Sequence, residues 1–234
     1  MMKRDQVWMT AQTQAPLIVA LVLSSALAVA MTAVRVVHSG SWVYTFLVWN
    51  LFLAWIPLAF ALVLWWVSQW PRRPWGLSMA LLGGWLLFFP NAPYIVTDLM
   101  HVGAHHDVPL WYDAMMIFVF AWNGLLLGFV SLWIVHQIVE RRLGVVAGWF
   151  MVASALVAGG FGIYLGRFLR WNSWDVVTTP HSLLANILDL LVNPLAYPHA
   201  FSVTVAFAGT LAVMYVTLAL LLRTQSRFDR TKHA

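Results

Sequence analysis

Apolar residues run along this chain in six long stretches, separated by polar connections that are short except for residues 169–199. Each stretch is long enough for the roughly 20 residues with which an α-helix crosses a bilayer core of ~30 Å. The pattern therefore predicts an all-α fold, a polytopic membrane protein with about six transmembrane helices that forms a single integral membrane domain over residues 1–234. The helices are expected near residues 16–37, 43–68, 76–97, 109–135, 143–168 and 200–222.

The third stretch is interrupted by Pro90-Asn91-Ala92-Pro93. Proline lacks a backbone N–H and crowds the carbonyl four residues earlier, so the segment predicts a broken third helix and a non-helical backbone at Ala92. Carbonyls that lose their partners in lipid must be satisfied by protein or water, and Asn91 can supply a donor and an acceptor. Two interpretations stay open: a kink closed by a neighbouring helix, or a break that lines a ligand cavity.

The long connection contains an apolar segment, residues 179–193, that predicts a short helix near 180–192. Thr179 suits its N-cap, Pro180 its first turn, and Asn193-Pro194 its end. The segment is too short to cross a bilayer, so we expect it to lie in the outer interface, where it could cover a site. The apolar face is expected to consist of Leu183, Leu184, Ile187, Leu188 and Leu191.

Composition supports the membrane assignment, since 62% of the residues are hydrophobic and only 9% are charged. Soluble domains carry about 25% charged residues. The net charge of +5 comes from basic residues between the apolar stretches and at the chain ends, a distribution that indicates membrane topology and not nucleic-acid binding. The chain has no cysteine, which excludes disulfides and thiolate chemistry.

The basic residues also predict the orientation. Cytoplasmic loops of membrane proteins are enriched in Lys and Arg, and ten of the 13 such residues fall on one side of the predicted helices. This side is therefore expected to be cytoplasmic, with both termini inside. The other side carries only Arg35, Arg167 and Arg170.

The first apolar stretch allows a second interpretation. Lys3 and Arg4, followed by an apolar run and Ala28-Val29-Ala30, also fit a secretory signal peptide with its cleavage site. The apolar run continues to Val37, past that site, which favours a retained helix.

Most of the histidines and acidic residues fall on the predicted outer side, six of the eight histidines and five of the eight acidic residues, which indicates a polar site open to the outside. Asp98 and His101 are the candidate catalytic residues, because either could act as a general base. Arg167 and Arg170 could pair with Asp98 or Asp113, bind a phosphate, or extend to the headgroup layer. The candidate binding residues are Asn50, Asn91, Asp113, Asn123, Arg167, Arg170, Asn172 and Asp175. Asn50 and Asn123 are equally typical of hydrogen bonds between helices.

A metal site is a further hypothesis for this region. Asp98, His101 and His105 are spaced i, i+3 and i+7, and would share one face if the helix continued that far. A carboxylate and two imidazoles could hold a divalent metal such as Zn²⁺ or Mn²⁺. Gly103 weakens such a helix, and clustered histidines are also typical of a solvated loop.

Four segments resemble one known family: FFPNAPYIVTDL (88–99), PLWYD (109–113), WNGLLLGF (122–129) and FGIYLGRFLRWNSWD (161–175). They resemble the bacterial domain-of-unknown-function family numbered 1361, over about residues 45–222. The resemblance implies a multi-pass protein of the bacterial cytoplasmic (inner) membrane and carries no activity. It places seven residues on motif positions: Asp98, His101, Asp113, Arg167, Arg170, Asn172 and Asp175.

Three classes of function fit these features. The favoured one is an enzyme acting in the outer headgroup layer on a lipid headgroup or a lipid-linked, anionic substrate. The alternatives are a non-catalytic subunit that binds a lipid or a partner protein, and a small transporter. Polar groups at the membrane midplane, which a transporter needs, are few. Membrane lipids are expected partners and nucleic acids are not; neither a cofactor nor an oligomeric state can be read from the sequence.

Overall fold

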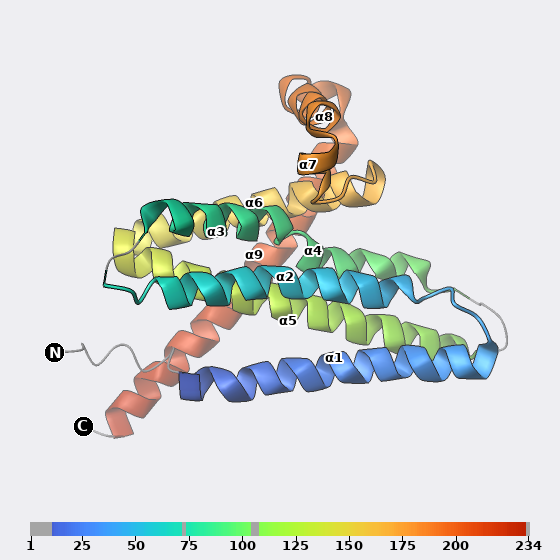
Figure 1. The fold of residues 1–234 in the computed structure, drawn as a ribbon, viewed down its shortest axis with the longest axis horizontal. Helices are drawn as coiled ribbons and strands as arrows, with labels where there is room; N and C mark the ends of the chain where they lie inside the picture. Colours follow the sequence, from blue (N-terminus) through green and yellow to red (C-terminus); the bar gives the residue numbers. More distant parts are fainter. Residues whose placement is uncertain (1–10, 72–73, 104–107, 233–234) are drawn as a thin grey trace.

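The computed structural model of the 234-residue chain describes residues 11–71, 74–103 and 108–232 (Figure 1). Within these ranges the chain is helical, and six segments are long and apolar enough to cross a membrane, which confirms the predicted all-α polytopic fold. The long helices are α1 (Ala11–Ser39), α2 (Phe46–Val67), α3 (Trp75–Phe88), α5 (Leu110–Leu143), α6 (Val145–Phe168) and α9 (Pro198–Lys232). The short ones are α4 (Asn91–Tyr94), η2 (Ile95–His101), α7 (Asp175–Thr178), α8 (Pro180–Val192) and η3 (Pro194–Ala196).

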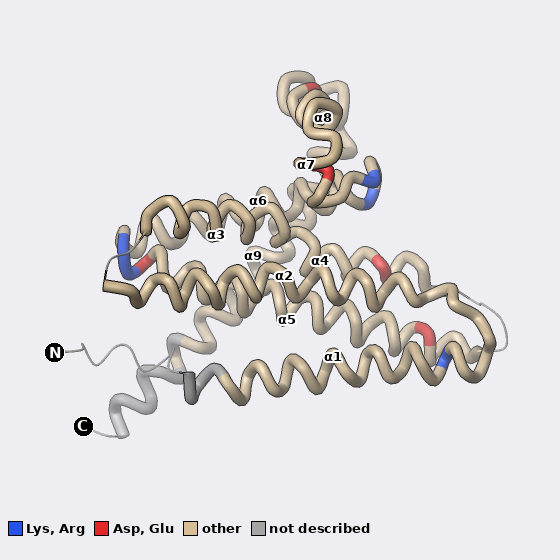
Figure 2. Tube along the Cα trace, in the orientation of Figure 1, with Lys and Arg blue, Asp and Glu red and all other residues tan. Residues whose placement is uncertain are grey.

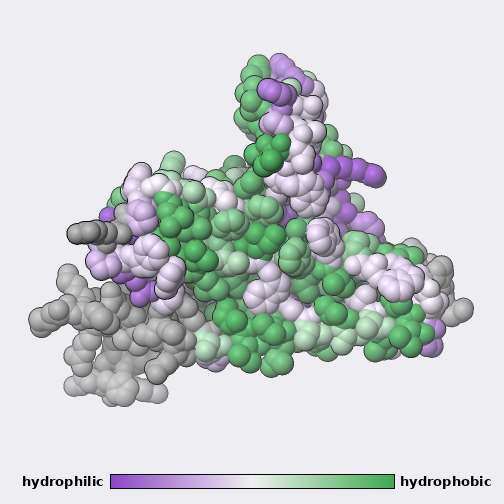
Figure 3. Space-filling view, viewed as in Figure 1, coloured by the Kyte–Doolittle hydropathy of each residue, from purple (hydrophilic) through white to green (hydrophobic). Residues whose placement is uncertain are grey.

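Helix α5 forms the centre of the fold. Over its most apolar window α5 is 61% buried, compared with 17% for α1 and for α9. It packs against α1, α2, η2 and α6, while α9 packs mainly along α6. The remaining apolar surface, which covers much of the face in Figure 3, is what a bilayer would cover.

Helix α5 is also longer than the sequence predicts. The fourth apolar stretch was expected to end at residue 135, but the helix continues to Leu143 and stops at Gly144, whose φ of 91° suits glycine. Its last turns contain Glu140, Arg141 and Arg142, which are good helix formers even though they are polar. Hydropathy therefore located the apolar part of the helix and not its end.

Charged residues lie near the ends of the described helices and are sparse along their middles (Figure 2). This arrangement is expected in a bilayer, because a charge in hydrocarbon must be paired or reach the headgroup layer.

The predicted break in the third span is present, but the chain bends only slightly there. Helix α3 ends at Phe88, and α4 and η2 continue in roughly the same direction (Figure 1). Ala92 lies within α4, so the expectation of a non-helical backbone at this residue is wrong. A Cβ atom on Gly124 of α5 would lie 2.4 Å from the Ala92 carbonyl oxygen, so only glycine lets the two helices approach this closely.

Two side chains satisfy carbonyls at the break. The Asn91 amide donates to the Phe88 carbonyl oxygen at 3.0 Å and to Ser173 Oγ at 2.9 Å. Ser173 Oγ in turn donates to the Leu87 carbonyl oxygen at 3.1 Å. The break is thus closed by a side chain of its own and by one from the segment that follows α6.

The short helix predicted near 180–192 is α8, with Pro180 in its first turn. Thr179 occupies the N-cap, but its side chain makes no capping hydrogen bond. The expected apolar face is divided, since Leu183 is buried and Ile187 half-buried while Leu184, Leu188 and Leu191 are exposed. The helix projects sideways from the bundle, where the exposed leucines can face lipid (Figure 1).

Candidate functional site

The candidate site is built around a buried ion pair between Arg167 of α6 and Asp98 of η2. Arg167 Nη2 contacts Asp98 Oδ1, and the guanidinium also donates to Thr97 Oγ1 at 2.8 and 2.5 Å. The Asn50 amide donates to Asp98 Oδ2 at 2.9 Å. Both oxygens of the fully buried carboxylate are therefore engaged, and the expected pairing of these two residues is present.

The Arg167 guanidinium also lies over an aromatic ring. Its central carbon is 4.7 Å from the centroid of the Tyr94 ring, a cation–π distance. Tyr94 belongs to α4, directly after the break, so the break places this ring beside the ion pair. Arg167 is thus fixed on two sides by α4 and η2, and its charge is balanced by Asp98.

Arg170 differs from Arg167 in every one of these respects. It is exposed where α6 ends, and it makes no ion pair with any residue that the structure describes. Its backbone has a φ of 61°, in the left-handed region that few residues other than glycine adopt. Holding an arginine there costs roughly 1–2 kcal/mol.

A basic pocket of about 630 Å³ opens beside Arg170. We use this name for the space lined by Tyr94, Met100, His101, Gly166, Arg167, Arg170 and Asn172. It lies in the region where Figure 3 shows a hydrophilic patch at the end of α6, next to α7. The pocket brings together four sequence-predicted residues from two separate motifs: His101, Arg167, Arg170 and Asn172.

An apolar groove of about 290 Å³ adjoins the basic pocket. The groove runs between α2, the broken third span, α6 and α8, and it shares Tyr94, Gly166 and Asn172 with the basic pocket. Its apolar lining includes Leu53, Leu86, Ala158, Phe161 and Ile187, and its polar lining consists of Asn50, Asn91, Asn172 and Ser173.

The structure has features of both interpretations of the break, a closed kink and a break that borders a cavity. Asn91 closes the break and also borders a cavity. Asp98 does not line this groove; Asn50 lines it and donates to the Asp98 carboxylate.

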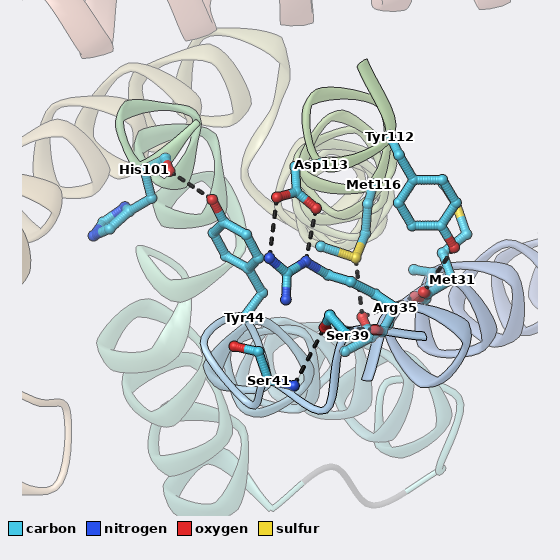
Figure 4. A network of polar contacts seen from close by, with 11 residues as sticks. Met31, Arg35, Ser39, Ser41, Tyr44, His101, Tyr112, Asp113 and Met116 are labelled. Carbon is cyan, nitrogen blue, oxygen red and sulfur yellow. Dashed lines mark hydrogen bonds and ion pairs between the residues drawn. The ribbon is translucent and has the colours of Figure 1, made fainter. Parts of the chain in front are cut away.

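Asp113 lies in a second buried network, shown in Figure 4. Its carboxylate binds Arg35 of α1 through two contacts, Nε to Oδ1 at 2.7 Å and Nη2 to Oδ2 at 3.1 Å. Both side chains are almost fully buried. Of the two carboxylates considered as partners for Arg167 or Arg170, only Asp98 takes that role, and Asp113 instead pairs with the arginine that α1 supplies.

Tyr44 connects this second network to the rim of the basic pocket. Its ring lies 4.5 Å from the Arg35 guanidinium carbon, and its hydroxyl donates to the His101 backbone carbonyl oxygen at 2.8 Å (Figure 4). Burial, and then the Asp113 carboxylate, raise the pKa of Tyr44, so the hydroxyl keeps its proton and remains a donor. Arg35 was expected on the outer side but was given no partner, and Tyr44 was not predicted to take part, although a lone arginine in an apolar stretch is a recognisable signal.

The remaining predicted binding residues have local partners. The Asn123 amide donates to the Ser24 carbonyl oxygen of α1 at 3.1 Å, the helix-joining role considered for it. Asp175 accepts hydrogen bonds from the Asn172 backbone N–H at 2.7 Å and from Thr178 Oγ1 at 3.0 Å. These bonds, led by the backbone N–H, lower the pKa of Asp175. Asp175 thereby holds the loop that carries Asn172 to the pocket mouth.

The metal hypothesis is not supported by the described residues. They contain no cluster of three His, Asp or Glu side chains that could hold an ion, and Asp98 is occupied by Arg167 and Asn50. His101 is exposed on the rim of the basic pocket. His105, the third expected ligand, lies outside the described residues, so a bound divalent metal stays a prediction.

A buried polar cluster at the opposite end of α5 escaped the sequence argument. His136 is fully buried, with Nδ1 2.8 Å from Tyr215 Oη of α9 and Nε2 3.2 Å from Glu140 Oε2. The signal was available, because His136 and Glu140 are spaced i, i+4 at the end of an apolar stretch. The cluster joins α5 to α9 far from the basic pocket.

Comparison with known proteins agrees with the motifs. The protein family described as "protein of unknown function (DUF1361)" matches residues 49–220, which include the whole basic pocket and groove but not α1. No curated protein and no solved structure matches the chain. Its six long apolar helices are those of a multi-pass membrane protein, and since the match covers well over half of its residues, the chain belongs to the DUF1361 family.

Proposed function

We propose that this protein binds the anionic headgroup of a lipid, or of a lipid-linked molecule, in the basic pocket. The observation that carries the proposal is the difference between Arg167 and Arg170. Arg167 is balanced by Asp98, whereas Arg170 lines the same pocket without an ion-pair partner among the described residues. The pocket therefore has an uncompensated positive charge, which a phosphate or carboxylate would neutralise.

The chemistry of the other lining residues supports an anionic ligand. A guanidinium presents a planar pair of donors that fits phosphate and carboxylate oxygens. The exposed His101 and Asn172 side chains add donors on the same rim. Arg170 keeps its position despite an unfavourable φ, and such backbone strain is typical of functional sites.

The position of the pocket supports a membrane ligand over a soluble one. Arg167 belongs to the last turn of a predicted membrane span, and the pocket opens where that span ends. With the orientation expected from the basic residues, this end faces the outside of a bacterial cytoplasmic membrane and both termini are cytoplasmic. The ligand would then belong to the outer leaflet.

An enzyme acting on the same headgroup is the second candidate, and His101 favours it. Its imidazole is exposed in the basic pocket and could transfer a proton to or from a bound headgroup. Asp98 is less suited to this role, because both of its oxygens already accept hydrogen bonds. Transport has weaker support, because the groove adjoining the pocket is lined at its deep end by Leu53, Leu86 and Ala158.

Native mass spectrometry can test the binding proposal. The purified protein would be released from nanodiscs that contain equal parts of phosphatidylcholine and phosphatidylglycerol. The number of molecules of each lipid that stay bound to the protein would then be measured. We expect phosphatidylglycerol to be enriched, and the Arg170→Gly variant to lose the enrichment about tenfold, as for a charge-assisted hydrogen bond. Glycine suits the backbone at this position, so the variant should fold.

The control is Arg141→Ala, which removes an exposed arginine from the opposite end of α5. This variant should keep the enrichment. Equal enrichment in the wild type and Arg170→Gly would contradict the proposal. Turnover of a lipid that His101→Asn abolishes, with retained binding, would establish the enzyme.

A further inference from the structure

We infer that the apolar groove holds the hydrocarbon chain of the molecule whose headgroup enters the basic pocket, so that the ligand is an anionic amphiphile and not a free anion. This inference rests on the proposed function and names the class of its ligand. It commits the groove to one occupant, a single alkyl, acyl or prenyl chain.

The first argument is that the two cavities are continuous. Tyr94, Gly166 and Asn172 line both the basic pocket and the groove. A headgroup near Arg170 would therefore stand at the mouth of the groove, and a chain attached to it would lie directly above the opening.

The second argument is the change of polarity along the groove. At its mouth the lining includes Trp171, Asn172 and Ser173, from the segment that follows α6. At its deep end it consists of Leu53, Leu86 and Ala158, from the interior of three membrane spans. A surface that is polar at one end and apolar at the other is complementary to an amphiphile.

The third argument is that a chain could enter from the bilayer. Trp49 is 54% exposed and Leu86 is 41% exposed, although both line the groove, so its side is open between α2 and α3. Leu183 and Ile187 of α8 line the groove from the opposite side, and α8 thereby covers part of it.

Glycines in α6 keep the wall of the groove in place. A Cβ atom on Gly162 would lie 2.5 Å from the Pro90 ring, and one on Gly166 would lie 3.2 Å from the Tyr94 ring. The wall therefore includes a tight contact between α6 and the proline break. Substitution of these glycines would disturb the fold, so a useful variant must fill the groove from a different position.

Ala158 offers such a position, because it is half-buried and lines the deep part of the groove. Ala158→Phe should fill this part while leaving Arg170 and His101 unchanged. Ala153 is its matched control on the same helix; it is exposed and lines the adjoining cavity between α6, α8 and α9, which Ala158 also borders, but it does not line the groove. Ala153→Phe adds the same side chain outside the groove.

Photo-crosslinking tests the inference with the full chain in phosphatidylcholine nanodiscs. The probe is hexadecyl phosphate with a diazirine at the end of its chain, and hexadecanol with the same diazirine is the uncharged reference. Crosslinked residues would be identified by peptide mass spectrometry. We expect the phosphate probe, and not the alcohol, to label Leu53, Leu86 or their neighbours.

The variants separate the two proposals. Ala158→Phe should reduce labelling in the groove about tenfold, since an added ring in a packed site leaves no room for the chain, while Ala153→Phe should not. Arg170→Gly should abolish the difference between phosphate and alcohol probes. If the phosphate and alcohol probes label the groove of the wild type equally, the headgroup proposal fails while the groove inference stands.

Two results would overturn the inference while leaving the headgroup proposal intact. One is labelling that depends on Arg170 but falls outside the groove and is unaffected by Ala158→Phe. The other is complete displacement of the probe by an equal concentration of inorganic phosphate, which would show that the chain adds nothing to the affinity of the headgroup.

Discussion

At the scale of single residues, the main feature is that two arginines three positions apart have different roles. Arg167 points into the protein, where it binds Asp98 and Thr97 and stacks on Tyr94. Arg170 follows the end of the helix and remains exposed. A buried ion pair is weak evidence for added stability, but removing one partner leaves an uncompensated charge. Arg167 therefore has a structural role, which Arg170 does not share.

The contribution of Arg167 to the stability of the fold can be measured by thermal unfolding. Arg167→Ala should lower the free energy of unfolding by about 3 kcal/mol, because it leaves the Asp98 carboxylate buried without a counter-ion. Thermal unfolding in detergent would detect this as a lower Tm. The double variant Arg167→Ala with Asp98→Asn should recover part of the loss, since the buried charge is then absent.

The control for this experiment is Arg141→Ala, which removes an exposed arginine and should leave Tm nearly unchanged. Equal Tm values for the two single variants would mean that Arg167 contributes no more than a surface charge, and the described network would then be unimportant for folding.

Sequence alone predicted that Asp98 or Asp113 would pair with Arg167 or Arg170, which includes the observed Asp98–Arg167 pair, but it did not predict the Arg35–Asp113 pair. The physical reason is that the sequence does not show which helices are neighbours. Each pair joins a carboxylate and a cation at the same depth in the membrane, and the predicted spans show which residues share a depth. Which helices are neighbours depends on packing in three dimensions, and α1 lies against α5. A cation in the first span was therefore available to Asp113, although nothing in the order of the chain shows it.

At the scale of elements, the broken third span is the part that builds the site. Pro90 and Pro93 interrupt the helix, Asn91 and Ser173 satisfy its carbonyls, and Tyr94 then reaches Arg167. The break could be predicted from sequence, because proline interrupts a helix through its own backbone chemistry. The partner Ser173 could not be predicted, because it comes from a loop 82 positions later.

The accessibility of this element can be tested directly because the chain has no cysteine. A single Asn91→Cys thiol, placed on the groove lining, should react with a charged, membrane-impermeant thiol reagent added outside intact cells. The reason is that the groove joins the basic pocket, which is proposed to open to the outside. Mass spectrometry of the purified protein would measure the labelled fraction.

Leu82→Cys is the matched control, since it lies earlier in the same span and does not line the groove. It should be labelled much less. A folded Asn91→Cys protein that resists the reagent would show that the break is a closed kink, or that the site faces the cytoplasm.

For helix α8, the sequence pattern predicted the bounds of the helix but not the orientation of its side chains. Its bounds follow from Pro180 and Asn193, whose backbone chemistry is local. The orientation of its leucines is not local, because in a membrane both the protein and the lipid accept apolar side chains. Periodicity therefore identified an apolar helix without showing which side contacts the groove.

At the scale of the whole molecule, the structure combines an apolar body with one basic pocket at the end of α6. The six spans could be predicted from hydropathy, because only helices long enough to satisfy their own backbone can cross lipid. The site required contacts among α2, the broken span, α6 and α8, which no single motif contains. Sequence motifs supplied the pocket residues, and the fold supplied the adjoining groove.

The central claim is that Arg170 binds an anionic headgroup whose chain occupies the groove. A crystal or cryo-electron-microscopy structure with bound hexadecyl phosphate tests it most directly. The account predicts the phosphorus density in the basic pocket, with phosphate oxygens about 3 Å from the Arg170 guanidinium, and chain density continuing between α3 and α6. Phosphate density at the opposite end of the molecule, beside Arg141, with an empty basic pocket, would contradict it.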